Sequence, residues 1–179
     1  MTAEAILTWH DFFVTIAQVG ATLAGLLFVG LTISLPHVLG VSGYLSRAFA
    51  ALFLQFEMLV IGLWGLLPSQ SGFALGVEYV CTGLAFATGI TVFAWNFPED
   101  GTTVLGGRGA RLVRTTLGFA GTWLPVLAGI GLIAGRDWAL FLLMPTAISC
   151  LYLSIGNAWV FAVEIPRRMN QSRSNGPVT

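Results

Sequence analysis

The chain has 179 residues, of which 56% are hydrophobic and only 9% are charged. A water-soluble domain is about 25% charged, so this composition leaves too few charges for a surface that faces water on all sides. The formal net charge is zero, which argues against a nucleic-acid partner. All eight basic residues are arginines, and the lack of lysine excludes Schiff-base and P-loop lysine chemistry.

Five apolar runs are each long enough to cross a bilayer, which takes about 20 residues. An isolated strand would leave its backbone polar groups unsatisfied in lipid, so the runs are predicted to be helices. Their predicted ranges are 9–35, 46–67, 73–97, 112–134 and 138–163. Pro36, Pro68 and Pro166 are expected to close the first, second and last runs. The predicted fold is an all-α polytopic transmembrane bundle over residues 1–166, followed by a polar tail over 167–179.

The arginines predict how the chain is oriented. Five crossings place the two termini on opposite sides of the membrane. Seven arginines fall on one side, around residues 47, 108–114 and 167–173, whereas only Arg136 falls on the other. Because positive residues accumulate on the cytoplasmic side, the N-terminus is predicted outside and the C-terminus in the cytoplasm.

A polar stripe runs along the first predicted helix. Its members are spaced alternately four and three residues apart, which places them on one narrow face of a helix. The stripe can line a water-filled pore, or its side chains can bond a neighbouring helix or their own backbone. The sequence leaves both interpretations open. The stripe comprises Asp11, Thr15, Gln18, Thr22 and Gly25, and it continues through Val29 and Thr32.

Two further faces flank the stripe. Small side chains on one face favour close helix packing of the small-xxx-small kind, within the chain or between chains. Bulky apolar side chains on the other face are expected to contact lipid. The small face comprises Ala17, Gly20, Ala21 and Ala24, and the bulky face comprises Phe12, Ile16, Val19, Leu23 and Leu27.

Glu57 lies about halfway along the second predicted helix, so it is expected near the bilayer midplane. A charge there costs at least about 2.5–3.5 kcal/mol, and an ionisable residue inside the membrane is a functional candidate. The carboxyl is expected either to be neutral or to face water, with Thr22 and Ser149 as candidate hydrogen-bond partners. The structural alternative is a protonated glutamate that bonds a neighbouring helix. Glu78, in the outer third of the third helix, is a second intramembrane ionisable candidate, whereas Gln55 is expected to point elsewhere on its helix.

The sequence contains no recognisable catalytic or metal site. His10 and His37 are the only histidines, and they are expected near opposite membrane boundaries, too far apart to share a metal ion within one chain. There is no HExxH motif, and the GGRG at 106–109 is not followed by the GK[ST] of a P-loop. Neither a cofactor nor an enzymatic activity is therefore expected.

The chain contains the segments W-x-D-F at 9–12, A-x-L-x-G-L-L-F-V at 21–29, L-P-S-Q-S at 67–71, L-G-V-E at 75–78 and N-A-W-V-F-A-V-E-I at 157–165. Together these segments resemble a family of bacterial, actinobacterial-type integral membrane proteins with five helices. The resemblance implies the same fold and location in a bacterial inner membrane, and it carries over no catalytic or binding residue. Some members are named modulators of the FtsH membrane protease, although this chain lacks the seven-helix layout of the protein for which that name was coined.

Three functional hypotheses follow for a chain expected to contact membrane lipids and to form a homo-oligomer. The first is a cation-preferring ion channel in which the first helix lines the pore and Asp11 forms an acidic ring at its outer mouth. The second is a non-enzymatic accessory subunit that binds another membrane protein, such as a membrane protease, through the small face of that helix. The third is a proton-coupled carrier that uses Glu57.

Overall fold

The computed structural model describes residues 6–38, 42–96, 108–159 and 163. Within these ranges the chain forms five long helices and one short 3-10 helix, with no strand. The predicted tail over 167–179 lies outside the described residues. The helices are α2 (His10–Val38), α3 (Ser42–Gly65), α4 (Gly72–Asn96), α5 (Arg108–Ile133), η1 (Asp137–Leu142) and α6 (Leu143–Trp159).

Five helical segments are long and apolar enough to cross a membrane. They contain 18 to 24 residues each, with η1 and α6 together forming the last one. At a rise of about 1.5 Å per residue, such lengths match a hydrocarbon core of about 30 Å. The prediction of five helices that are long and apolar enough to cross a membrane is therefore confirmed for the described residues.

Prolines explain where two helix ends differ from the predicted ones. α2 continues through Pro36 to Val38, because a proline near the end of a helix costs only the few hydrogen bonds that remain there. The run predicted as one helix over 138–163 is divided between η1 and α6. Pro145, in the first turn of α6, has no N–H to donate to the carbonyl of Phe141, so one α-helical hydrogen bond is missing at the junction of η1 and α6.

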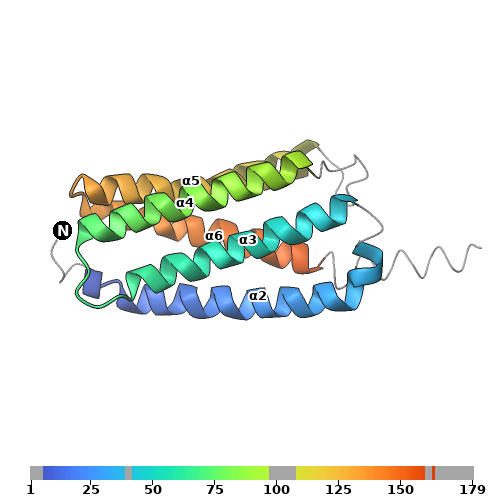
Figure 1. Ribbon diagram of the computed structural model, residues 1–179, viewed down its shortest axis with the longest axis horizontal. Coiled ribbons are helices and arrows are strands. Elements are labelled where there is room, and N and C mark those ends of the chain that lie inside the picture. The colour runs from blue at the N-terminus through green and yellow to red at the C-terminus, as the bar shows by residue number, and fades with distance from the viewer. Residues whose placement is uncertain (1–5, 39–41, 97–107, 160–162, 164–179) are drawn as a thin grey trace, which may run out of the picture.

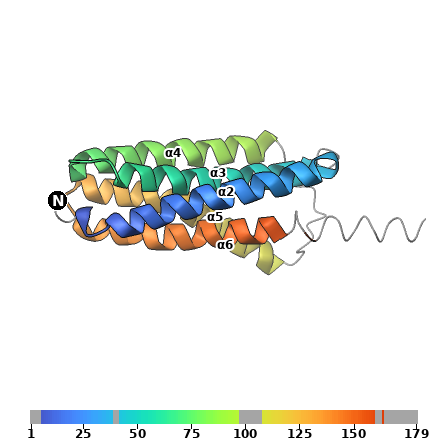
Figure 2. The ribbon, with the colours of Figure 1, turned by 90° about the horizontal axis from the view of Figure 1, so that it is seen from below.

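The helices alternate in direction, and the start of α2 lies at the opposite end of the bundle from the end of α6 (Figure 1). α4 and α5 run together along one edge, and α2 runs along the opposite edge (Figure 1). α3 contacts α2, α4, α5 and α6, so other helices surround it on several sides. The view from below shows α6 and α2 near each other along the same side of the bundle (Figure 2).

Small residues bring the helices of each hairpin into close contact. A Cβ added to Gly62 of α3 would lie 2.8 Å from the Cβ of Ala17 of α2. A Cβ added to Gly76 of α4 would lie 2.7 Å from the carbonyl oxygen of Gly129 of α5. Dispersion between closely packed backbones is a main source of helix association in lipid, where there is no hydrophobic driving force. The bundle is thus built from two tight pairs, α2–α3 and α4–α5, with α6 packed against α3 and α5.

A glycine shapes the turn that leads from α5 into η1. Gly135 has a φ of +72°, a left-handed conformation that glycine adopts without a Cβ clash. Its N–H bonds the carbonyl of Leu132, and the N–H of Arg136 bonds the carbonyl of Gly131, both at 2.9 Å. This Schellman arrangement satisfies the last carbonyls of α5.

Candidate functional site

The polar stripe of α2 faces away from the rest of the bundle. All five of its predicted pore-lining members lie on the exposed side of the helix, and α2 itself lies along one edge of the molecule (Figure 1). A single chain therefore encloses no passage lined by this stripe. Within a membrane, the stripe contacts either lipid or further chains. The five residues are Asp11, Thr15, Gln18, Thr22 and Gly25.

The threonines of the stripe are satisfied by their own helix. The hydroxyl of Thr15 donates to the carbonyl of Asp11, and that of Thr22 donates to the carbonyl of Gln18, both at 2.7 Å. The amide of Gln18 forms no side-chain hydrogen bond to any described residue. An unpaired amide in hydrocarbon is costly, so Gln18 is the stripe residue that most requires water or a partner chain.

The expectation that the bulky face of α2 contacts lipid is wrong. Ile16 and Leu27 of this face are buried, and Phe12 and Val19 pack against the hydrophobic core. Lipid and protein interiors are equally apolar, so bulk alone does not show which face points outward. The polar stripe, rather than the bulky face, forms the outer surface of this helix.

The small face of α2 is partly used within the chain. Ala17 packs against Gly62, and a Cβ added to Gly20 would lie 3.0 Å from the backbone nitrogen of Leu59. These two residues therefore hold α2 against α3. The other two members, Ala21 and Ala24, are exposed and half-buried, beside the polar stripe. Of the small face, Ala21 and Ala24 are thus left to contact another chain.

Glu57 is completely enclosed, with 0% of its surface exposed. Neither carboxyl oxygen has a hydrogen-bond partner among the described residues. The expected bond to Thr22 is wrong, because Thr22 lies on the outer face of α2 and donates to its own helix. Ser149 is buried on α6 but does not bond the carboxyl either. A carboxylate without partners is costly in such an interior, which argues for the neutral acid.

The core beside Glu57 is formed by three helices. Leu54, one turn earlier on α3, packs against Gly121 of α5 and Cys150 of α6. A Cβ added to Gly121 would lie 3.1 Å from Cδ2 of Leu54 and 3.3 Å from Sγ of Cys150. Cys150 is also close enough to Glu57 to interact with it electrostatically. The carboxyl is therefore in the centre of the bundle and not on its lipid-facing surface.

Gln55 is the polar residue that the sequence interpretation undervalued. Its side chain is 0% exposed, and its amide nitrogen donates to the carbonyl of Cys150 at 3.3 Å and to the hydroxyl of Ser154. The signal that would have found it is on α6, where one face is polar and entirely buried. That face comprises Thr146, Ser149, Ser154 and Asn157.

Glu78 belongs to a different part of the molecule. It is half-buried on α4, and its carboxyl accepts a hydrogen bond from the amide of Gln70 in the connection between α3 and α4. This bond ties the connection to the helix, and it does not bring Glu78 to Glu57. Among the described residues, no three His, Cys, Asp or Glu side chains are close enough to hold a metal ion.

No protein-family model matches the sequence, and neither the curated proteins nor the solved structures include a significant match. Two features of the chain itself point to function: the outward stripe of α2 and the enclosed polar residues of α3 and α6.

Proposed function

We propose that the protein is a homo-oligomeric, cation-preferring ion channel in which α2 lines the pore. The observation that carries this proposal is the exposure of the whole polar stripe on one edge of a membrane-spanning bundle. Facing lipid, this edge would leave the amide of Gln18 unsatisfied. Facing the axis of a ring of identical chains, it would contact water.

Rotational assembly is required because one chain places the stripe on its outside. Copies arranged around an axis beside α2 bring one stripe from each chain to a common centre. Small residues permit this approach: Ala21 is exposed, and a Cβ added to Gly25 would meet no atom within 4 Å. The pore would then be lined by threonine and glutamine side chains over several helical turns.

The ion preference follows from Asp11. It lies in the first turn of α2 and is exposed, so a rotational assembly repeats its carboxylate once per chain around one mouth. A ring of carboxylates concentrates cations and repels anions. His10 lies 3.4 Å from this carboxylate and is exposed as well.

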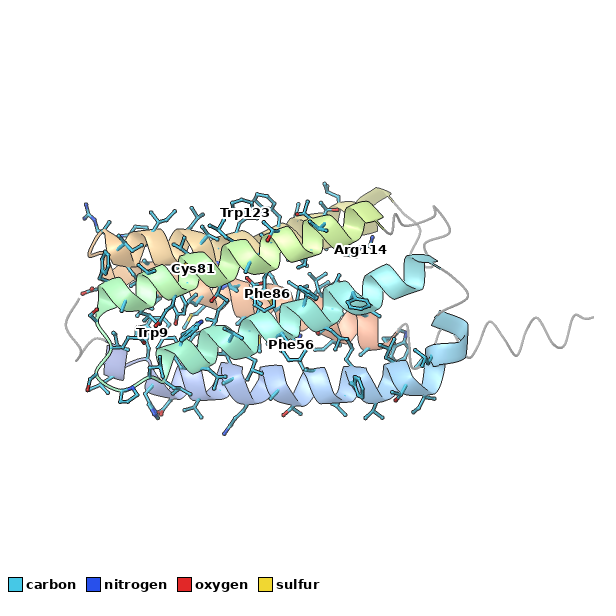
Figure 3. All side chains as sticks on the ribbon, viewed as in Figure 1. Trp9, Phe56, Cys81, Phe86, Arg114 and Trp123 are labelled. Carbon is cyan, nitrogen blue, oxygen red and sulfur yellow. The ribbon has the colours of Figure 1, made fainter. Side chains whose placement is uncertain are left out.

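The positive-inside rule supports an orientation for this pore. Trp9 and Arg114 lie toward opposite ends of the bundle (Figure 3). Arg108 and Arg111 precede Arg114 at the start of α5, so they belong to the same end of the bundle. Arg136 lies in the turn after α5, at the other end. Arginine-rich ends face the cytoplasm, so the Asp11 ring would form the outer mouth in a bacterial inner membrane.

An accessory subunit is the second candidate, because the same outward face can bind a different chain. Its predicted interface was the small face of α2, but Ala17 and Gly20 are occupied by α3. This candidate therefore depends on the polar stripe too. Extraction in mild detergent followed by native mass spectrometry distinguishes the two: a ring of identical chains supports the channel, and a stoichiometric foreign chain supports the accessory subunit.

The direct test is ion flux through the full-length protein in liposomes. Wild type should conduct cations in preference to anions, and Asp11→Asn should lower that preference while conduction remains. Asp137→Asn is the matched control, because Asp137 is also exposed at the same end of the bundle but lies outside the stripe. Bilayers that remain electrically silent across voltage, pH and membrane tension would rule out the channel.

A further inference from the structure

The core contains unpaired hydrogen-bonding groups near Glu57 that the channel proposal does not use. Both carboxyl oxygens lack a partner among the described residues, although the side chain has no exposed surface. A proline removes one backbone hydrogen bond in the same core. Pro125 lies inside α5 and is buried, and it has no N–H to bond the carbonyl of Gly121, one turn earlier. Gly121 packs against Leu54 and Cys150, and Leu54 precedes Glu57 by one turn of α3.

A row of buried polar side chains leads from this region along α6. Gln55 of α3 bonds both the carbonyl of Cys150 and the hydroxyl of Ser154. Asn157, one turn beyond Ser154, is 8% exposed and lies near the end of α6. Buried polar groups in a membrane protein are retained where they serve a pathway or bond a neighbouring helix. Gln55 is two positions from Glu57 on α3, and Ser154 and Asn157 follow on α6 toward the end of that helix.

We propose that Glu57 is an intramembrane proton-binding site that exchanges its proton with water through the polar row of Gln55, Ser154 and Asn157. In the closed bundle the site holds the neutral acid. Release breaks the O–H bond of the carboxyl and transfers the proton to a water molecule, which leaves a carboxylate and a hydronium ion. The carbonyl of Gly121, which receives no N–H from Pro125, is a candidate acceptor for the acid or for that water. Uptake is the reverse step.

The neighbouring helices contribute few other titratable groups. α6 presents Cys150, and α4 presents Tyr79, whose hydroxyl donates to the carbonyl of Ile61 at 3.3 Å. In the described part of α5 the titratable side chain is Arg114, which lies close to the end of the helix (Figure 3). On α2, Asp11 points outward. No described cation is therefore placed to hold Glu57 as a carboxylate while the bundle is closed.

Infrared difference spectroscopy of the full-length protein in liposomes tests the protonated state directly. Wild type should show the carbonyl stretching band of a buried carboxylic acid, and Glu57→Gln should lose it. Glu78→Gln is the matched control and should keep it. If Glu57→Gln does not fold, Glu57→Asp should shift the band instead. A band that survives in the folded Glu57→Gln protein, or its absence from wild type at every pH at which the protein is folded, overturns the proposal.

The route is tested by exchange and by chemical labelling. Transfer to deuterium oxide should shift the acid band, and Ser154→Ala or Asn157→Leu should slow the shift several-fold. Dicyclohexylcarbodiimide, which adds the O–H of a neutral acid across a C=N bond, should modify Glu57 faster at low pH than at high pH. An unchanged exchange rate in both α6 variants would overturn the route.

The channel proposal and the Glu57 proposal can be tested independently of each other. Asp11→Asn should leave the acid band and the carbodiimide adduct unchanged, because Asp11 is on the outer face of α2. Glu57→Gln should leave the cation preference of the α2 pore unchanged. Loss of ion preference together with loss of the acid band in one of these single variants would contradict the assignment of two independent sites.

Discussion

Gly76 of α4 and Gly129 of α5 form a reciprocal backbone contact. A Cβ added to Gly76 would lie 2.7 Å from the carbonyl oxygen of Gly129, and a Cβ added to Gly129 would lie 2.5 Å from that of Gly76. Neither position has room for a methyl group. The two helices are thus as close here as their backbones allow. Farther along the same pair, Gly83 of α4 packs against Val126 of α5.

Gly129→Ala should therefore separate α4 from α5. We expect the free energy of unfolding to fall by about 1–3 kcal/mol, the usual cost of forcing extra atoms into a packed contact. Titration of the reconstituted protein with a denaturing detergent measures it. Gly118→Ala on the same helix is the control, because a Cβ there meets no atom within 4 Å. Equal stability of both variants would contradict the close contact.

Gln55 and Ser154 should be energetically coupled. Gln55→Leu removes the amide that bonds α6, and interhelical hydrogen bonds of this type contribute about 0.6 kcal/mol on average and up to about 1.7 kcal/mol. In a double-mutant cycle, Gln55→Leu combined with Ser154→Ala should cost less than the sum of the single variants. Gln18→Leu, on the exposed face of α2, should leave the stability of the single chain unchanged. Strict additivity would argue that the bond contributes nothing.

A cysteine at position 18 should react with a charged, membrane-impermeant thiol reagent. The pore proposal places Gln18 against water, although it lies well inside the candidate span His10–Ile33. The measurement is the labelling rate in a Cys81→Ser background, since Cys81 is exposed and Cys150 is buried. Ile148→Cys is the control, because Ile148 is 66% exposed on α6 and should face lipid. Labelling at position 148 but not at position 18 would contradict the pore proposal, because water would then contact the outer face of α6 and not the stripe of α2.

Two copies of the chain should be joined by an oxidant through Gly25→Cys. Gly25 is exposed on the stripe and open to a neighbour, so symmetry-related cysteines would lie close to the proposed axis. Non-reducing electrophoresis measures the disulfide-linked dimer. Gly156→Cys is the matched control, because Gly156 is also an exposed glycine with no atom within 4 Å of an added Cβ. Cross-linking through 156 alone would move the interface to α6.

The two ends of the chain should lie in different compartments. A cysteine replacing Leu7, which is 67% exposed before α2, should be labelled from outside intact cells. A cysteine replacing Thr179 should be labelled only after the cells are opened. Labelling of both in intact cells would contradict the five crossings and the depth assigned to Glu57.

The sequence by itself determined the helices and their number. Each crossing depends on the length of one apolar run against the thickness of a bilayer, which is a local property. The position of Glu57 halfway along the second run is local in the same way, and this residue is indeed enclosed. The stripe of α2 was likewise predictable from its spacing, because helical periodicity alone brings its members to one face.

Only the tertiary structure decided which faces point inward. The bulky face of α2 is buried and its polar stripe is exposed, the reverse of the expectation for a helix in lipid. Gln55 and Glu57, two positions apart on α3, are both enclosed because helices surround α3 on several sides. The physical reason is that hydrocarbon and protein interior are equally apolar. Hydrophobicity therefore marks the segments that enter the membrane, and backbone fit between small residues decides how they pack.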